Sequence, residues 1–220
     1  MTEELKNRIE TTMQNLRLNK MEPYFVQTSA EACEKVSELL EKGCTVSCGG
    51  SVTLKQTGVY DLISSADYDF LDRSVPGLTR EQVEEIYRKT FFADAFVTST
   101  NALTENGELY NVDGNSNRVA AILYGPKSVI VVCGVNKIVK NIDEAINRVK
   151  TKAAPPNTVR LNIDTYCAKT GQCVSLNKEN PEMCEGCHSD GRICCNYVVC
   201  AQQRHVNRIK VIIVNEELGY

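Results

Sequence analysis

The stretch that decides the fold is "CTVSCGGSVTL" (44–54). Its first five residues have the length and the apolar character of a buried β-strand. Gly49, Gly50 and Ser51 follow at once, and a helix is expected from Val52 onward. A strand that passes through a glycine turn into a helix is typical of open α/β sheets.

The rest of the chain repeats this alternation. Helices are expected at 3–19, 29–42, 52–64, 79–92 and 141–152, and strands at 23–28, 44–48, 68–72, 95–100, 107–114, 119–125, 128–134 and 208–216. Pro155 and Pro156 should end the last of these helices. Strands that alternate with helices predict an α/β fold, a three-layer α/β/α sandwich with a mainly parallel sheet.

Four regions follow from this reading. We expect an N-terminal helix (1–20), an α/β core (21–160), a cysteine-rich metal-binding segment (161–205) and a C-terminal strand (206–220) that returns to the core. The region 161–205, called the cysteine segment below, has few aliphatic side chains and cannot bury much core of its own. Either a metal or contacts with the core should hold it.

Composition narrows the possible functions. The 220 residues have a net charge of −3 and no basic block, so nucleic-acid binding has no electrostatic support. The longest apolar runs are strand-sized, which predicts no membrane span. The N-terminus is charged and lacks the apolar core of a signal peptide, so we expect a cytoplasmic protein.

The glycine turn is the first candidate binding element. At the carboxyl edge of the sheet, the backbone N–H groups of Gly49, Gly50 and Ser51 could bind a phosphate or a carboxylate. A tight turn that needs glycine geometry explains the same residues equally well.

A second candidate is the polar stretch "TSTNALTENGELYNVDGNSNRVA" (98–120). Its amides could bind a ligand, Arg118 could clamp an anion, and Glu105 supplies a carboxylate. Turn formation explains Gly107 and Gly114, but it does not explain so many asparagines. We therefore expect a pocket for a small anionic ligand, lined by Asn101, Asn106, Gly114, Asn115, Asn117 and Arg118.

The third candidate is a cluster of cysteines that could bind a metal. Seven of the eleven cysteines lie between 167 and 200, and Cys184 and Cys187 form a CxxC pair. In a reducing cytosol, clustered cysteines are more often metal ligands than disulfides. Four of them could hold zinc or an iron–sulfur cluster, and the spacing alone does not choose between the two.

Several of these segments together resemble the LUD-domain family, the lactate utilization proteins. The resemblance rests on "GGSVTL" (49–54), the stretch 98–120, "YGPKSVIVVCGVNKIV" (124–139) and "VIIVNEELGY" (211–220). It implies a fold like that of the sugar-phosphate isomerase and CoA-transferase superfamily. It also implies a role in oxidising L-lactate to pyruvate beside iron–sulfur partner proteins.

The same resemblance bears on the metal ligands. The family's cysteine pattern, C…TGxC…C…RIC, is similar to Cys167, Cys173, Cys187 and Cys194 here, with Cys184 as the alternative third ligand. It implies an iron–sulfur cluster, taken as [4Fe–4S], with zinc as the alternative.

Two other functions stay open. "TENG" (104–107) is similar to the Ser-Glu-Asn-Gly motif of class I CoA-transferases, which would make Glu105 a catalytic carboxylate nucleophile. Alternatively, the chain is a non-enzymatic binding module with a structural metal. A homo-oligomer is compatible with all three functions.

Overall fold

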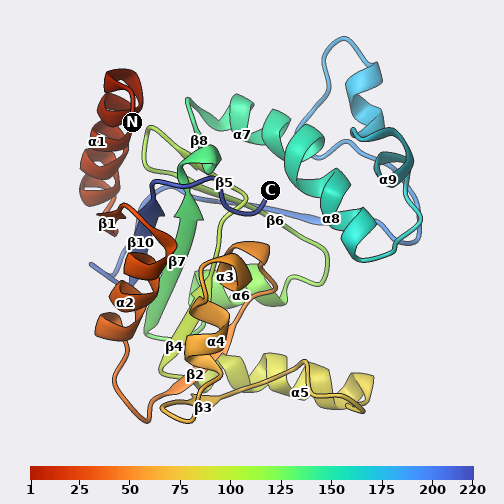
Figure 1. The fold of residues 1–220 in the computed structure, drawn as a ribbon. Helices are drawn as coiled ribbons and strands as arrows, with labels where there is room; N and C mark the ends of the chain where they lie inside the picture. The colour runs from red at the N-terminus through yellow and green to blue at the C-terminus, as the bar shows by residue number, and fades with distance from the viewer.

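The computed structural model describes residues 1–220 and has a six-stranded sheet at its centre (Figure 1). Across the sheet the strands are β1 (Glu22–Val26), β10 (Ile209–Val214), β7 (Ser128–Gly134), β4 (Ala95–Thr98), β2 (Thr45–Cys48) and β3 (Asp69–Phe70). All neighbouring pairs are parallel. The central strands are almost continuously apolar because both faces of the sheet are covered.

The chain reverses its direction across the sheet beside β2. It passes outward through α3 (Val52–Gln56) and α4 (Val59–Ile63) to the edge strand β3. It then returns through α5 (Arg80–Lys89) and η1 (Thr90–Phe92) to β4, on the other side of β2. Such a reversal opens a crevice at the carboxyl ends of the two strands.

The two faces of the sheet are covered differently. On one face, α2 (Ser29–Leu39), α3 and α4 pack Val36, Leu54 and Ile63 into one apolar cluster. On the other face, α1 (Glu3–Leu18) and α6 (Asn117–Tyr124) share a cluster with residues of a second sheet, such as Leu103. The mainly parallel α/β fold is confirmed, but one of its outer layers contains strands as well as helices.

The second sheet has four strands and lies toward the cysteine segment. Its order is β8 (Ile138–Val139), β5 (Ala102–Thr104), β6 (Leu109–Asp113) and β9 (Asn196–Cys200). Short helices surround it: η2 (Val135–Lys137), α7 (Ile142–Arg148), η3 (Val149–Ala153), α8 (Ala154–Arg160), α9 (Tyr166–Thr170) and η4 (Val174–Asn177). Strand β9 pairs with β6, so the end of the cysteine segment is bound to the core.

Two expectations about local structure are wrong. Residues 119–125 are not a strand but part of α6, in which Val119 and Ile122 are buried one helical turn apart. A short apolar run fits a strand and a buried helix equally well. Pro155 and Pro156 do not end a helix either, because they lie in the first turn of α8, where a missing N–H costs nothing.

Other expectations are confirmed with shorter bounds. The helix expected at 79–92 begins with a reciprocal capping box between Thr79 and Gln82. The helix expected at 52–64 is divided in two at Gly58, whose positive φ of 75° breaks the hydrogen-bond pattern. No helix is both long enough and apolar enough to cross a membrane.

Candidate functional site

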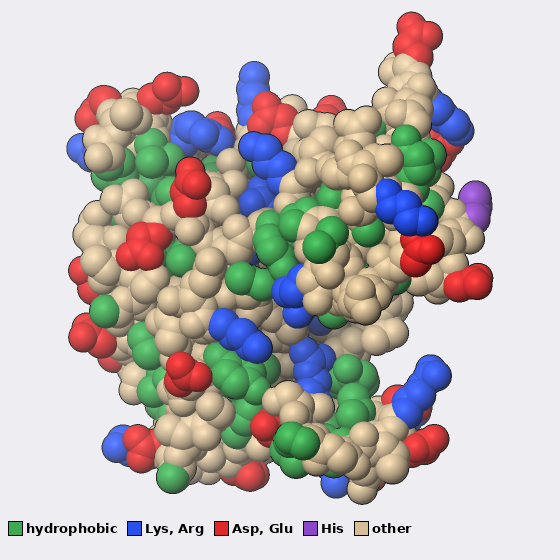
Figure 2. All heavy atoms as spheres, turned by 45° about the vertical axis from the view of Figure 1, so that its right-hand side comes forward, with side chains coloured by type: hydrophobic (Ala, Val, Ile, Leu, Met, Phe, Trp, Pro, Cys, Tyr) green, Lys and Arg blue, Asp and Glu red, His purple; other side chains and the backbone are tan.

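A cleft of about 790 Å³ opens where the chain reverses beside β2. Its walls come from the carboxyl ends of β2 and β4, from β6 and the first turn of α6, and from α8 and the cysteine segment. Basic side chains gather around the hollow on this face of the molecule (Figure 2). The basic residues that line it are Arg73, Arg118, Lys137, Arg160 and Arg192, against the acidic Asp113 and Asp190. The excess of positive charge suits an anionic ligand.

Most of the ligand residues expected from the sequence lie in this cleft. They are Gly50, Ser51, Asn101, Gly114, Asn115, Asn117 and Arg118. Gly49 stands behind the wall instead, where a Cβ would lie 2.7 Å from Thr98 Oγ1 and 3.0 Å from Arg118 Cδ. This glycine is needed so that the Arg118 side chain can cross β2 closely. Because α3 has only five residues, its N-terminus offers little helix dipole to an anion.

Arg118 is fixed by the protein rather than left free for a ligand. Its Nη1 donates to Asn111 Oδ1 at 2.5 Å and to Ser99 O at 3.4 Å. Its Nη2 donates to Asn101 Oδ1 at 3.0 Å and to Val112 O at 2.7 Å, and its Nε lies 3.4 Å from Asp113 Oδ2. Both terminal nitrogens of the guanidinium therefore donate to acceptors that the protein supplies. Arg118 organises the cleft wall, and other cations must meet the ligand.

Arg73 and Lys137 are two other basic side chains of the cleft. Arg73 stacks over the Tyr87 ring at 5.4 Å and, with the Asn117 amide oxygen turned toward it, donates to that oxygen at 3.2 Å. The buried Lys137 Nζ donates to Thr53 Oγ1 and Ser99 Oγ, each at 2.9 Å. Both partners are neutral, so the ammonium charge has no counter-ion in these hydrogen bonds.

Glu105 and Asn106 lie away from the cleft. They form the turn between β5 and β6, which packs against α1. Glu105 Oε1 accepts from Arg8 Nε at 2.6 Å, and the Asn106 carbonyl accepts from Asn19 Nδ2 at 2.9 Å. Neither residue lines the cleft, so the sequence motif around Glu105 serves the packing of the N-terminal helix.

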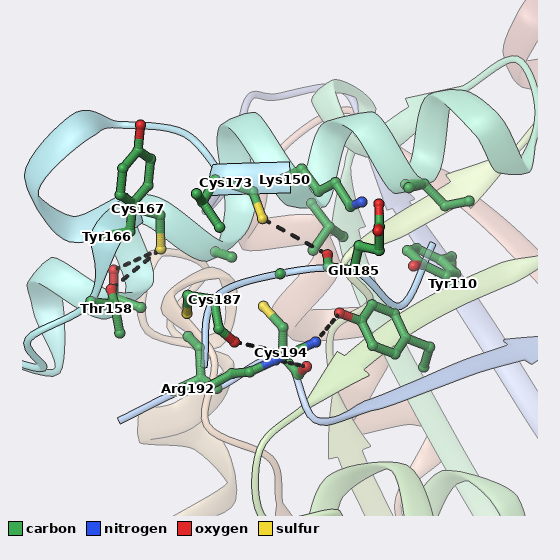
Figure 3. Close-up of a pocket in the computed structure, with 18 residues that line it drawn as sticks. Tyr110, Lys150, Thr158, Tyr166, Cys167, Cys173, Glu185, Cys187, Arg192 and Cys194 are labelled. Atoms are coloured by element: carbon green, nitrogen blue, oxygen red, sulfur yellow. Dashed lines mark hydrogen bonds between the residues drawn. The ribbon is translucent and has the colours of Figure 1, made fainter. Parts of the chain in front are cut away.

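A second, smaller cavity of about 30 Å³ lies between the cysteine segment and the core, where residues of β6, α7, η3 and α8 also line it. Cys167, Cys173, Cys187 and Cys194 line it together, and their sulfur atoms face a common space (Figure 3). Cys184 and Cys195 are exposed and do not line this cavity. Cys184 lines a separate outer groove instead, together with the exposed His188.

Hydroxyl groups accompany the thiols of this cavity. Cys173 Sγ lies 3.4 Å from Ser175 Oγ, and Cys187 Sγ lies 3.4 Å from Ser189 Oγ. Cys167 Sγ lies 3.3 Å from the Thr165 hydroxyl. Hydrogen bonds to cysteine sulfur are one means by which proteins set the potential of iron–sulfur clusters.

The thiols are also electrostatically coupled. Burial raises the pKa of Cys194 to about 12, and the neighbouring Cys167, Cys173 and Cys187 add to the shift. Four thiolates cannot share this space without a cation. The hydroxyl of Tyr110, a fully buried residue that lines the cavity, has no hydrogen-bond partner. Thiols and an unpartnered donor around one void are the chemistry that a metal cluster would satisfy.

Protein contacts hold the loop that carries these cysteines. Arg192 donates to the carbonyls of Cys184, Cys187 and Cys194 at 2.8–3.0 Å. The Cys173 N–H donates to the Lys150 carbonyl at 2.8 Å. No group of three or more His, Cys, Asp or Glu side chains is arranged to hold a single metal ion. The four thiols ring the cavity but do not converge on one point.

The sequence does not single out several residues that line the two candidate sites. They are Arg73, Tyr110, Lys137 and Arg192. For Lys137 a signal existed, because it lies three residues beyond the glycine that ends an apolar strand, at the carboxyl edge of the sheet. For Tyr110 there was none, because the cysteines with which it shares the cavity lie far along the chain.

These features define an α/β protein with a basic cleft at the switch point of its parallel sheet and a thiol-lined cavity beside it. The chain belongs to the LUD domain family, whose model matches residues 9–214. The fold is similar to that of a DUF162 family protein from Deinococcus radiodurans, with 15% identity, 96% of each chain covered and a TM-score of 0.50.

A slighter likeness links the chain to eIF2B beta from Chaetomium thermophilum. It has 18% identity, covers 54% of this chain and 42% of that one, and has a TM-score of 0.36. No curated protein matches the sequence.

Proposed function

We propose that this LUD-domain protein binds a small anionic or phosphate-bearing ligand in the cleft and holds a [4Fe–4S] cluster in the cysteine cavity. Cys167, Cys173, Cys187 and Cys194 would be the ligands. The protein would act in the cytoplasm as one component of L-lactate oxidation to pyruvate. We also propose that its fold is related to that of the sugar-phosphate isomerase and CoA-transferase superfamily.

The observation that carries this proposal is a shared wall. Cys194, Arg192 and Ile193 line both the cleft and the cysteine cavity, and so do Val149 and Ala154 from the adjoining helix. A ligand in the cleft would therefore lie against the side chains that enclose the cluster. That arrangement suits the passage of electrons between an organic anion and a metal centre.

We propose a cluster rather than a single zinc ion because of how the thiols are arranged. Structural zinc needs four ligands that converge within about 2.3 Å of one point. The thiols here surround a void instead, and no three ligands converge. A cluster would take up electrons one at a time when bound. Oxidation of lactate releases two electrons and two protons, so iron–sulfur partner proteins would carry the electrons away.

Anaerobic purification or reconstitution with iron and sulfide tests this proposal. We expect a brown protein with about four irons per chain, an EPR signal after reduction, and a change in that signal on addition of L-lactate. Cys187→Ser should abolish the cluster, whereas the matched change Cys184→Ser in the same CxxC pair should leave it intact. A colourless protein with one tightly bound zinc would contradict the electron-transfer role.

That outcome would favour the second function, a binding module with a structural metal. The third function, covalent catalysis by Glu105, has less support, because this carboxylate is paired with Arg8 outside the cleft. Incubation with acetyl-CoA and then hydroxylamine would label Glu105 if a thioester formed there. We expect no label.

A further inference from the structure

Lys137 is a buried amine at the floor of the cleft. It is the last residue of η2, directly beyond the carboxyl end of β7, and only 4% of its surface is exposed. Its two hydrogen-bond partners, Thr53 Oγ1 and Ser99 Oγ, are neutral hydroxyls on α3 and after β4. A lysine that served only as a buried counter-charge would be paired with a carboxylate.

The charges around Lys137 favour the neutral amine. Burial lowers the pKa of Lys137 to about 7. The Cys133 thiol from β7 opposes this shift, whereas the guanidinium groups of Arg148 from α7 and Arg118 from α6 reinforce it. Desolvation and cationic neighbours are the two conditions that turn a lysine into a nucleophile. At neutral pH a large share of Lys137 therefore carries a free electron pair.

The amine is open to the cleft because the residue above it is a glycine. Gly219 has a φ of +60°, and a Cβ there would lie 2.6 Å from Thr53 Oγ1 and 3.3 Å from Lys137 Nζ. A side chain at this position would close the space over the amine. Lys137, Thr53, Ser99 and Gly219 all line the cleft, so the amine borders the space that a ligand would occupy.

We propose that Lys137 forms an imine with a small carbonyl compound that carries an acid group, such as a short oxo acid. The acid group would lie among the basic side chains of the cleft, and in this respect the inference rests on the proposed anion site. The cysteine cavity and its metal play no part in it.

The step balances without an oxidant. The electron pair of Nζ attacks the carbonyl carbon, a C–N bond forms, and a carbinolamine results. The carbonyl oxygen then leaves as water and takes with it the two hydrogens that the neutral amine carried. The hydroxyls of Thr53 and Ser99 lie 2.9 Å from Nζ and can relay these protons.

Reductive trapping tests the inference on the unaltered protein. The full chain is incubated with pyruvate and cyanoborohydride at pH 7.5, and each lysine is assayed by peptide mass spectrometry. We expect one carboxyethyl group on Lys137, formed at least about tenfold faster than on the exposed Lys140, because an ordinary lysine is almost fully protonated at this pH. Hydroxyacetone, which has the same carbon skeleton without the carboxylate, should label Lys137 far less.

The variants Lys137→Met and Lys140→Met are the matched pair. The first should lose the selective label and the second should keep it. If pyruvate binds in the cleft by calorimetry while Lys137 stays unlabelled, the imine is disproved and the anion site stands. If pyruvate neither binds nor labels, with phosphate and L-lactate also failing to bind, the proposed anion site falls as well.

Discussion

The cleft and the cysteine cavity lie against each other but are built on opposite principles. In the cleft wall, both terminal nitrogens of Arg118 donate to acceptors that the protein supplies, among them Asn101 and Asn111, and its Nε lies beside Asp113. In the cavity, thiols and the Tyr110 hydroxyl face a void. Arg118 is therefore held without a ligand, whereas the Tyr110 hydroxyl in the cavity has no partner that the protein supplies.

Removal of metal should have the largest effect, and it should change the cysteine cavity but not the cleft. In the reconstituted protein, chelation should expose the cysteine segment, because the four thiols would lose the cluster that joins them. The rate of amide hydrogen exchange at 164–195 should rise about a hundredfold, as expected when a protected loop becomes exposed to solvent. The strands β7 and β10 should keep their protection. Equal exchange before and after chelation would mean that Arg192 alone holds the segment.

The next effect concerns the cleft. Arg118→Met leaves Asp113, Asn101 and Asn111 without their shared donor in a buried place. We expect a loss of about 3–5 kcal/mol in the free energy of unfolding, the usual result of breaking a buried ion pair from one side. Denaturant unfolding measures it, with the exposed Arg17→Met as the control, expected to change stability by less than about 0.5 kcal/mol. A loss below about 1 kcal/mol would show that the wall does not depend on Arg118.

The long strands of the sheet could be predicted from the sequence, and the reversal that creates the cleft could not. Runs such as 128–134 are apolar throughout because parallel strands are buried on both faces. The order of the strands depends on which distant segments pair, and no local pattern encodes that. The same limit explains why the apolar pattern at 119–125 wrongly predicts a strand. Whether this run forms a strand or the helix α6 depends on the distant residues against which it packs.

The candidate sites, too, could be predicted from the sequence only in part. Gly50, Ser51 and Arg118 were found because polar residues and glycines at strand ends are a local signal. What Arg118 does was not found, because its acceptors come from β6 and from the ends of other strands. Cys187 and Cys184 could not be separated by spacing, and only the folded loop turns one inward and the other outward.

A third effect probes the amine of the cleft. The rate of reductive labelling at Lys137 should follow the fraction of neutral amine. Because the pKa of Lys137 is lowered to about 7, the rate should fall about tenfold for each pH unit below that value and level off above it. Peptide mass spectrometry from pH 5.5 to 9 measures it, with pyruvate saturating at each pH. Labelling at the exposed Lys140 should go on rising above pH 8. A parallel pH dependence of both lysines would contradict the special environment of Lys137.

The smallest effect belongs to the cavity and tests what its unpartnered hydroxyl is for. In the protein without metal, Tyr110→Phe removes a buried donor that has no acceptor, so stability should stay level or rise by up to about 1 kcal/mol. With the cluster bound, the hydroxyl would donate to a cluster or cysteine sulfur. Such a bond stabilises the more negative, reduced state.

Tyr110→Phe should therefore make the midpoint potential more negative by roughly 40 mV, the one-electron equivalent of about 1 kcal/mol. EPR-monitored titration measures the shift. Tyr197→Phe is the matched control, because its hydroxyl lies at the same cavity but already has a protein partner, Arg192 Nη2, from which it accepts at 3.2 Å. An unchanged potential in Tyr110→Phe, together with a loss of stability in the metal-free protein, would mean that the hydroxyl has a protein partner. The hydroxyl would then resemble the Arg118 side chain in the cleft wall, which is held by partners that the protein supplies.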